Sequence, residues 1–355
     1  MTAAGHTLKE RGMTTVVIAG VGRFGDLHAR AWVEAGARIV GLVDPDRDRL
    51  AAVAEDRGVE HTGTELGPLL DRLRPDVVVI ASDEGSHAEL ALTALAAGCH
   101  VFVEKPLALS AADARRIAAG AAAQGRHVVA GHISRFTAAI SRMRGRVARG
   151  AIGQLCAVRL RRDFSRAWFL TFGDRVHPVW ESCIHDIDLA VAFAGSPVRT
   201  VSAIQSAAAG DAAPSVVTAQ LTFVNGIIAT VESAWLLPAA APATLDDGPL
   251  ALDGAIAGEA EILGLAGVLK QRLISDALVE WTEAGVAVPD LGLWPEEDGA
   301  VGGALRREIA YALGVFDGVR EPDVMPLREA IWGVEAAEAI VESLRTGAPV
   351  DITQP

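Results

Sequence analysis

Two short stretches of this sequence carry side chains suited to proton transfer, and the first contains Lys105. It lies in the run Glu104-Lys105-Pro106, directly after the apolar segment Val101–Val103. Pro106 restricts the preceding lysine to an extended backbone, and the bond between them can be cis. An ammonium in a partly dry pocket loses basicity because desolvation disfavours the charged form. Lys105 could then hydrogen-bond a substrate hydroxyl and share in its proton transfer, whereas an isolated lysine in a turn would be a surface residue.

The second stretch surrounds His185. Read as a helix, it places Glu181, His185 and Asp188 on one stripe, beside an apolar stripe that includes Ile184 and Ile187. A carboxylate one turn from a histidine can fix its tautomer and raise its basicity. The pattern indicates a general base for alcohol oxidation, or a general acid in the reverse direction. A capping histidine on a solvated acidic face explains this helix alone equally well.

A nucleotide site is indicated nearer the N-terminus, where a strand-like run is followed by a glycine-rich one. The glycine-rich run consists of Gly20, Val21, Gly22, Arg23, Phe24 and Gly25. In such a G-x-G-x-x-G pattern the glycines permit a tight turn, a close approach to a pyrophosphate and close packing of helix on strand. Asp44 follows about 20 residues later, where an acid binds the adenosine ribose. Such an acid repels a 2′-phosphate, so we predict NAD rather than NADP, although Arg47 and Arg49 follow closely.

These stretches belong to a repeating order of strands and helices up to residue 131. The predicted strands are Val16–Ala19, Ile39–Val43, Val77–Ala81, Val101–Val103 and Val128–Ala130. The predicted helices between them are Leu27–Ala35, Arg47–Arg57, Leu66–Leu73, His87–Ala97 and Ala111–Gln124. Continuous apolar strands that alternate with helices predict an α/β fold with a doubly wound parallel sheet, the Rossmann arrangement. Because ligands bind beyond the carboxyl ends of such strands, Lys105 should lie beside the cofactor.

After residue 153 strand-like runs follow one another directly. They are Gln154–Phe164, Val198–Gln205, Val216–Phe223, Ile227–Ala234, Ala255–Leu263 and Leu278–Glu283. Asn225-Gly226 between two of them is a hairpin signal, and two helices, Ala304–Val315 and Leu327–Leu344, close the chain. We therefore predict a disordered lead-in at 1–12, a dinucleotide-binding domain at 13–133 and a second α/β domain at 134–355. The second domain should contain an open, mostly antiparallel sheet, and its last helix can pack back on the first domain.

The composition of the chain argues against several classes of partner and compartment. The 355 residues carry a net charge of −13, which argues against a nucleic-acid partner because that would require a basic face. No apolar run approaches the ~20 residues of a membrane span, and residues 1–12 lack the apolar core of a secretory signal. The cysteines, three in number and far apart, make a disulfide framework improbable. We expect a cytoplasmic protein without a membrane or nucleic-acid partner.

Several blocks of the chain together resemble the Gfo/Idh/MocA oxidoreductases, a family named after glucose-fructose oxidoreductase and inositol dehydrogenase. The matching blocks are Gly20–Gly25, Asp44, Ala81-Ser82 with His87, Ala97–Leu107 including Glu104-Lys105-Pro106, Arg135-Phe136, Ile152-Gly153 and His185–Leu189. They occur in the family's order up to Pro197. The blocks E-K-P and H-D-I-D-L are the most specific. The end of the last helix, Ser343–Gly347, is also similar.

The resemblance implies NAD(P)-linked oxidation or reduction at a secondary carbon of a sugar, amino-sugar or cyclitol. It implies a homodimer or homotetramer formed through the C-terminal sheet. Its implied catalytic residues are Lys105, His185 and Glu181, where Glu181 replaces the family's aspartate. The implied cofactor contacts are Gly20, Gly22, Arg23, Phe24, Gly25, Asp44, Ser82, His87, Glu104 and Lys105, and the implied substrate contacts are Lys105, His132, Arg135 and His185. This chain departs from the family at Asp83, where proline is frequent, and at His132, where asparagine is frequent.

The long connection between Phe164 and Trp180 is a candidate substrate loop. Trp168 and Trp180 could contact the apolar face of a polar ring, and His177 could contact its hydroxyls; tryptophans that fill a core are the alternative. His177 and Cys183 lack the paired spacing of zinc ligands, so we expect no metal. Two other functions use the same fold. One is a non-catalytic NAD-binding regulator, which the presence of Lys105 and His185 disfavours, and the other is a reductase of a non-sugar imine or carbonyl.

Overall fold

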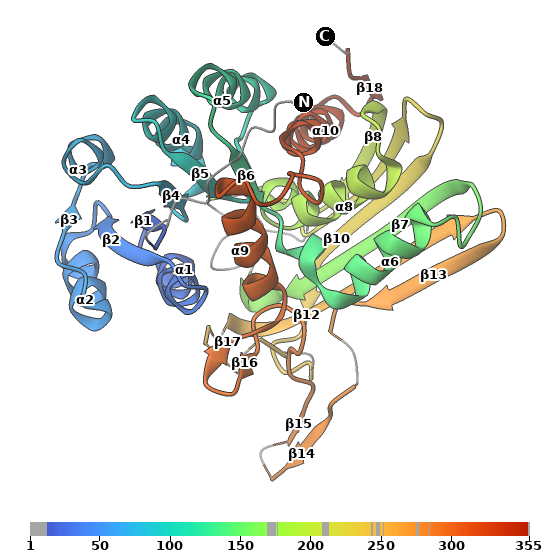
Figure 1. Cartoon of the computed structure of the whole chain (residues 1–355). Coiled ribbons are helices and arrows are strands. Elements are labelled where there is room, and N and C mark those ends of the chain that lie inside the picture. Colours follow the sequence, from blue (N-terminus) through green and yellow to red (C-terminus); the bar gives the residue numbers. More distant parts are fainter. Residues whose placement is uncertain are drawn as a thin grey trace, which may run out of the picture.

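A computed structural model describes residues 13–168, 175, 177–207, 213–242, 244–245, 249–250, 252–274, 277–283 and 285–353. The lead-in predicted at residues 1–12 lies outside this range. The described chain contains a parallel sheet near its N-terminus and a larger mixed sheet near its C-terminus, with helices between the two (Figure 1). This is the predicted fold class.

The first sheet has six parallel strands in the order β3-β2-β1-β4-β5-β6. They are β1 (Thr15–Ala19), β2 (Arg38–Val43), β3 (Thr62–Gly63), β4 (Val77–Ile80), β5 (His100–Glu104) and β6 (Val128–Gly131). The helices that connect them are α1 (Arg23–Glu34), α2 (Arg47–Arg57), α3 (Leu66–Leu73), α4 (His87–Ala96) and α5 (Ala111–Gln124). These helices cover both faces of the sheet (Figure 1), so the apolar runs of β1, β4, β5 and β6 are buried almost completely.

The second sheet has eight strands in the order β11-β12-β7-β10-β9-β8-β18, with β13 paired to β12. They are β7 (Leu155–Ser165), β8 (Val198–Ser206), β9 (Val216–Phe223), β10 (Ile228–Leu237), β11 (Thr244–Leu245), β12 (Leu252–Gly264), β13 (Gly267–Arg272) and β18 (Val350–Asp351). Strands β7 and β10 run parallel, and the other pairs are antiparallel. The hairpin expected at Asn225-Gly226 joins β9 to β10, and Gly226 has a φ of +87°.

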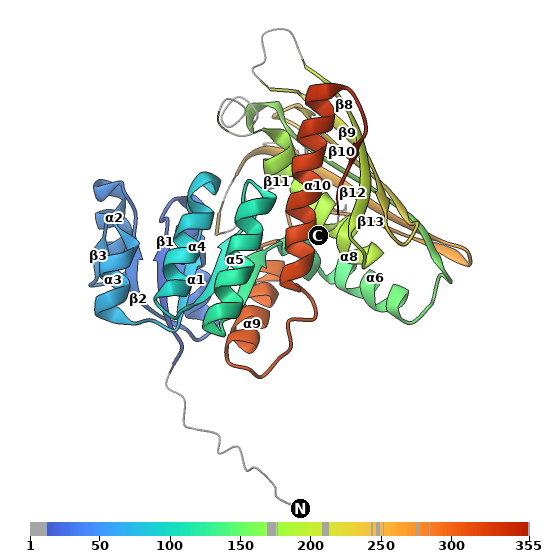
Figure 2. The ribbon, with the colours of Figure 1, turned by 90° about the horizontal axis from the view of Figure 1, so that it is seen from above.

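Further helices in the second half of the chain pack on one face of this sheet, against the first domain or against one another. They are η2 (Ile133–Phe136), α6 (Ala138–Ala148), η3 (Val179–Cys183), α8 (Ile184–Ala194), α9 (Gly303–Phe316) and α10 (Leu327–Thr346). Helix α10 lies between α5 and the second sheet (Figure 2), and α9 packs against α1 and η2. Apolar side chains form two clusters. One joins the first sheet and its helices to Phe164, Trp235 and Ile256 of the second sheet, and the other lies between the second sheet and the helices packed on it. The boundary expected after residue 133 stays a prediction; β6 ends at Gly131 and η2 begins at Ile133.

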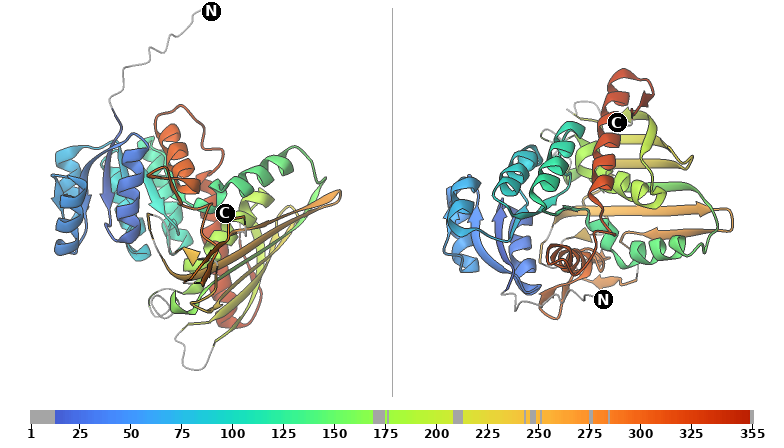
Figure 3. Two further views of the ribbon diagram at one scale, coloured as in Figure 1. Left: turned by 90° about the horizontal axis from the view of Figure 1, so that it is seen from below. Right: turned by 45° about the horizontal axis from the view of Figure 1, so that its top comes forward.

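The opposite face of the second sheet carries no helix from the described residues (Figure 3). Alternate side chains on it are charged and pair across strands, as Arg159 of β7 does with Glu261 of β12 at 2.7 Å. The strand predicted at 278–283 is not part of this sheet. Strand β14 (Glu280–Thr282) pairs only with β15 (Gly285–Ala287) in an exposed hairpin. A second small hairpin is formed by β16 (Glu296–Glu297) and β17 (Ala300–Val301).

Candidate active site

A cavity of about 760 Å³ lies at the carboxyl ends of the parallel strands and extends to the second sheet. Its nucleotide end is lined by Gly20, Gly22, Arg23, Phe24, Asp44 and Ser82. Its other end is lined by Glu104, Lys105, Arg162, Phe164, Trp168, Glu181 and His185. The structure thus brings most of the predicted residues to one cavity. Gly25, His87, His132, Arg135, His177 and Trp180 do not line it.

The glycine loop has the shape that a pyrophosphate requires. Gly20 has a φ of +88°, and a Cβ on it would lie 2.5 Å from the backbone nitrogen of Ser82. A Cβ on Gly25 would collide with the carbonyl oxygen of Gly20, so Gly25 sets the approach of helix to strand. On Gly22, by contrast, a Cβ would meet nothing closer than 3.8 Å, the distance to Arg49 Nη1. The space beside Gly22 is therefore open, and α1 begins there without a side-chain cap, leaving its first N–H groups suited to an anion.

Asp44 lies buried at the end of β2 and organises this loop. Its Oδ2 accepts the Val21 N–H at 2.8 Å, and its Oδ1 accepts the Asp46 N–H at 2.9 Å. Each carboxylate oxygen has a second lone pair, which leaves the side chain able to accept hydrogen bonds from ribose hydroxyls. The backbone of the loop and the carboxyl group of Asp44 therefore suit a dinucleotide.

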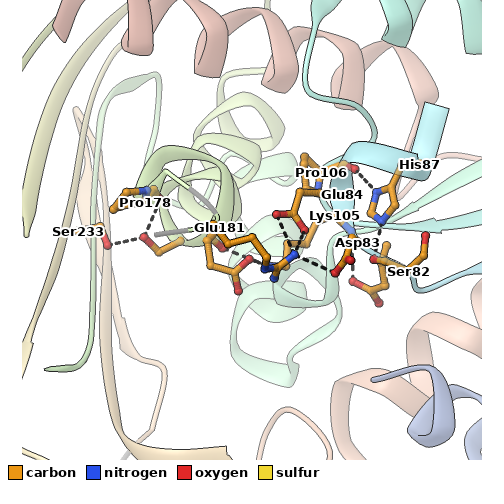
Figure 4. A network of polar contacts seen from close by, with 12 residues as sticks. Ser82, Asp83, Glu84, His87, Lys105, Pro106, Pro178, Glu181 and Ser233 are labelled. Atoms are coloured by element: carbon orange, nitrogen blue, oxygen red, sulfur yellow. Dashed lines mark hydrogen bonds and ion pairs between the residues drawn. The ribbon is translucent and has the colours of Figure 1, made fainter. Parts of the chain in front are cut away.

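Lys105 is held at the junction of the two domains (Figure 4). Its Nζ donates to Glu181 Oε2 at 2.9 Å and to the Glu181 carbonyl oxygen at 3.2 Å. The peptide bond between Lys105 and Pro106 is cis. The carbonyl oxygen of Pro106 lies 2.8 Å from His87 Nδ1, and that of Ser82 lies 3.1 Å from His87 Nε2. His87, expected to bind the cofactor, is instead buried and ties this turn to the end of β4.

A buried chain of hydrogen bonds, which the sequence did not predict, runs from Trp32 through His28 and Glu104 to the backbone of Lys105. Trp32 Nε1 donates to His28 Nδ1 at 3.3 Å, so the proton of a neutral His28 resides on Nε2, which lies 2.8 Å from Glu104 Oε1. Glu104 Oε2 accepts the backbone N–H of Lys105 at 3.1 Å. Burial alone would raise the pKa of Glu104, but the His28 hydrogen bond and the nearby positive charges lower it overall. No local pattern links His28 to Glu104, because they meet only through the packing of α1 on β5.

His185 differs from its predicted state in two respects. Its predicted partner, Glu181, contacts Lys105 instead, because the backbone from Val179 to Cys183 forms a π-helical turn that changes the one-turn spacing. Nδ1 of His185 is buried and has no hydrogen-bond partner among the described residues. Burial lowers the pKa of His185 well below its ordinary value, and the positive charges of Arg162 and Lys105 act in the same direction. His185 is therefore a neutral imidazole at the cavity, and a raised basicity does not fit this environment.

Arg162 is a further residue of this end that the sequence analysis missed. Its Nη2 donates to Asp186 Oδ1 at 2.7 Å and to Ser134 Oγ at 3.2 Å, and its Nε donates to the same carboxylate oxygen at 3.2 Å. The alternation of β7 could have indicated it, because Arg162 falls on the buried face of a strand that is otherwise apolar on that face. A buried arginine at such a position needs a carboxylate partner.

Arg135 does not reach the cavity. Its Nε and Nη2 donate to the two carboxylate oxygens of Asp188, each at 2.7 Å, and Nη2 also reaches the Asp188 carbonyl oxygen. Its Nη1 donates to Glu329 Oε2 at 2.6 Å and to the carbonyl oxygen of Val324 at 2.9 Å. All five N–H groups are engaged, so the expected substrate contact does not fit. His132 is buried behind it, with Nε2 3.8 Å from Asp188 Oδ1, and burial lowers its pKa.

The candidate substrate loop contributes one of its three predicted side chains to the cavity. Trp168 lines it and packs edge-on against Phe164, with ring centroids 5.2 Å apart. His177 uses Nδ1 to accept the Val179 N–H at 3.2 Å, which caps the following helical turn. Trp180 packs against the apolar core. Core packing and capping thus account for two of the three side chains; residues 169–174 and 176 of the loop lie outside the described range.

Arg175 of the same connection spans the two domains. Its Nη1 donates to Asp83 Oδ1 at 2.8 Å and to Glu84 Oε2 at 3.0 Å (Figure 4). Asp83 is the position at which the chain departs from the family's proline, and the departure supplies one of these two carboxylates.

Within the described residues no group of three His, Cys, Asp or Glu side chains is arranged to hold a metal ion. The same part of the chain contains no helix with the length and apolar character needed to cross a membrane. All three cysteines are free thiols; Cys99 and Cys183 are buried, and Cys156 is exposed.

Two protein-family models match this chain, one in each half. The family model described as "Oxidoreductase family, NAD-binding Rossmann fold" matches residues 14–132. The model of the GFO/IDH/MocA C-terminal domain matches residues 140–269. Together the two models cover the first sheet and most of the second, whose strand β18 lies outside the matched residues.

Relatives with a curated description match part of the chain. Inositol 2-dehydrogenase 1 of Saccharopolyspora erythraea is 35% identical over 49% of this chain and 52% of its own length. UDP-N-acetylglucosamine 3-dehydrogenase of Acidithiobacillus ferrooxidans is 32% identical over 62% of this chain and 66% of its own length. The matched region thus spans between half and two thirds of these relatives.

A solved structure extends the likeness of the fold to nearly the whole chain. Scyllo-inositol dehydrogenase from Lactobacillus casei, with bound NAD(H) and scyllo-inositol, superimposes with a TM-score of 0.80. It is 20% identical and covers 96% of this chain and 99% of its own.

Proposed function

Because the chain belongs to the Gfo/Idh/MocA oxidoreductase family, we propose that it is an NAD-dependent oxidoreductase acting on a secondary alcohol or ketone carbon of a sugar, amino-sugar or cyclitol. One observation carries the proposal: Lys105 and His185, from different domains, line the same cavity as the glycine loop. A protein that only bound the dinucleotide would have no need of an ammonium and a neutral imidazole at the other end. The dehydrogenases among its relatives support the same class of substrate.

The cofactor would be held by the glycine loop, the first turn of α1 and Asp44. The backbone N–H groups near Gly22 would bind the pyrophosphate, and Asp44 would accept the ribose hydroxyls. Bound NAD supplies the hydride acceptor for alcohol oxidation and, when reduced, the donor for the reverse reaction. The carboxyl group of Asp44 at the ribose favours NAD over NADP.

The substrate hydroxyl would lie between His185 and Lys105. Since Nδ1 of His185 is buried, we assign the uptake of the hydroxyl proton during oxidation to Nε2. The low pKa of His185 keeps this nitrogen unprotonated at neutral pH. Lys105 would donate a hydrogen bond to the same oxygen, and Glu181 would keep the ammonium in place. Trp168 and Phe164 offer an apolar wall for one face of a polar ring.

The test is turnover by the purified protein. With NAD and a panel of sugars, amino-sugars and cyclitols, we expect at least one compound to increase the absorbance of the reduced nicotinamide, and Lys105→Ala to abolish the increase. No change with any compound of the panel, in either direction of the reaction, would contradict the proposed substrate class. If Lys105→Ala instead kept the full biological activity of the protein, the non-catalytic regulator would be the better description.

We further propose that the protein works in the cytoplasm as a homodimer or homotetramer. The three free thiols support a reducing compartment. The helix-free face of the second sheet, with its alternating charged rows, supports a contact between copies of the chain. Light scattering after gel filtration would measure the number of subunits, and a monomer at all concentrations would contradict this assignment.

A further inference from the structure

Arg49 lies between the glycine loop and the acid assigned to the ribose. Its Nη1 is 3.7 Å from Asp44 Oδ2 and 3.8 Å from the position that a Cβ on Gly22 would take. Arg49 also lines the cavity. A guanidinium next to the ribose-binding position is the group with which dinucleotide-binding domains accommodate the 2′-phosphate of NADP. The chain therefore places such a group at the nucleotide end, although Asp44 favours NAD.

The carboxyl group of Asp46 binds the guanidinium of Arg49. Arg49 Nη2 donates to Asp46 Oδ2 at 2.9 Å, and the backbone N–H of Arg49 donates to Asp46 Oδ1 at 3.1 Å. Asp46 thus uses one oxygen to cap α2 and the other to bind Arg49. The backbone hydrogen bond from Arg49 lowers the pKa of Asp46, and the guanidinium acts in the same direction, so Asp46 is ionised at neutral pH. The guanidinium of Arg49 therefore faces two carboxyl groups, those of Asp44 and Asp46.

We propose that Arg49 forms a latent binding site for the 2′-phosphate of an adenosine nucleotide and that Asp46 keeps this site closed. The inference rests on the proposed dinucleotide pocket and assigns cofactor selectivity to a residue that does not line it. A 2′-phosphate would compete with Asp46 for Nη2 and would approach two carboxylates. Both side chains of the pair are nearly half exposed, at 48% for Arg49 and 44% for Asp46. The ion pair between Arg49 and Asp46 is therefore weak. Removal of the single negative charge of Asp46 should then allow a 2′-phosphate to bind Arg49.

The test uses two nucleotides that differ at the 2′ position. Binding of ADP and of adenosine 2′,5′-bisphosphate is measured by isothermal titration calorimetry for the wild type and Asp46→Asn. Asparagine still caps α2, and the Asp46 backbone N–H that contacts Asp44 is unchanged. We expect Asp46→Asn to bind the bisphosphate about tenfold more tightly, since one negative charge near the phosphate is removed, with the ADP affinity changed less than about twofold. Added salt should reduce the gain.

The double variant Asp46→Asn/Arg49→Gln is the matched control and should lose the gain. An equal gain in the double variant would assign the effect to the lost negative charge alone and would overturn the inference. The inference would also be overturned if all proteins bound ADP and Asp46→Asn showed no gain. Failure of the wild type to bind ADP would contradict the dinucleotide pocket itself. Asp46→Ser, which also caps helices, replaces Asp46→Asn should that variant fold poorly.

Discussion

The two ends of the cavity are built in different ways. At the nucleotide end one short stretch, Gly20–Gly25, supplies the loop. Its backbone N–H groups would make the contacts with the pyrophosphate. At the substrate end the side chains come from β5, β7 and the helical segment η3–α8, as Lys105, Arg162 and His185 show. Local sequence therefore sets the nucleotide end, while long-range packing sets the substrate end. Substitutions at the nucleotide end should therefore change stability and cofactor affinity, whereas substitutions at the substrate end should change turnover.

The largest effect is expected at the substrate end, for His185→Gln. Loss of a general base costs on the order of a thousandfold in kcat, equivalent to about 4 kcal/mol. Because His185 does not belong to the glycine loop, the NAD affinity measured by calorimetry should change little. Steady-state kinetics measure kcat for both forms.

His177→Gln is the matched control for this experiment. Burial also lowers the pKa of His177, but its side chain caps a helical turn and does not line the cavity. We expect its kcat to stay within about fivefold of the wild type, since capping contributes stability rather than chemistry. Equal losses for both variants would remove the distinction between the two histidines, and a normal kcat in His185→Gln would contradict its assigned role.

The second prediction separates fold from binding at the nucleotide end. Gly25→Ala places a Cβ against the carbonyl oxygen of Gly20, and overpacking against backbone should cost about 3 kcal/mol of unfolding free energy. Gly22→Ala meets no atom closer than 3.8 Å, so its stability should stay within about 1 kcal/mol of the wild type. It should still lose NAD affinity because the methyl occupies the space left for the pyrophosphate. Denaturant unfolding and calorimetry measure the two quantities, and equal stabilities would contradict the assigned role of Gly25.

The same contrast explains what the sequence could predict. The glycine loop and Asp44 follow from local spacing, and the apolar strands around them follow from burial on both faces. Lys105 lies at the cavity because it directly follows β5, and ligands bind at the carboxyl ends of parallel strands. The order of the family's blocks predicted His185 at the cavity, but the predicted contact between Glu181 and His185 does not form, because Glu181 binds Lys105. A π-helical turn changed the geometry between Glu181 and His185, and no residue pattern in this stretch announces that turn.

Arg135 and Glu104 show why the rest could not be predicted. A motif match cannot distinguish an arginine that binds a ligand from one that binds two buried carboxylates, and Arg135 is the second kind. The partner of Glu104 is His28, which lies far away in the sequence and faces it only because α1 packs on β5. These contacts depend on tertiary packing, which fixes partners that neither spacing nor periodicity encodes.

The smallest effect, measured per pH unit, concerns a carboxyl group buried on α9. Glu308 of α9 is fully buried, and neither of its carboxyl oxygens has a hydrogen-bond partner among the described residues. Burial raises its pKa well above the ordinary value of 4.5, and the negative charges of Glu104 and Asp188 raise it further. The folded protein therefore retains a proton that the unfolded chain releases. The stabilising contribution of this proton is complete below pH 4.5 and is lost as the pH rises through the raised pKa.

Glu308→Gln keeps the shape of the side chain without a titratable proton. Its unfolding free energy relative to the wild type should rise with pH by about 1.4 kcal/mol per pH unit above the unfolded pKa, until the raised pKa is reached. Urea denaturation of both proteins at several pH values between about 5 and 8 measures this difference. A difference that stayed constant or fell with pH would show that Glu308 is ionised in the folded state, with a partner or solvent that stabilises its charge. A rising difference would establish that α9 holds a neutral carboxylic acid and that this group makes the stability of the folded protein depend on pH.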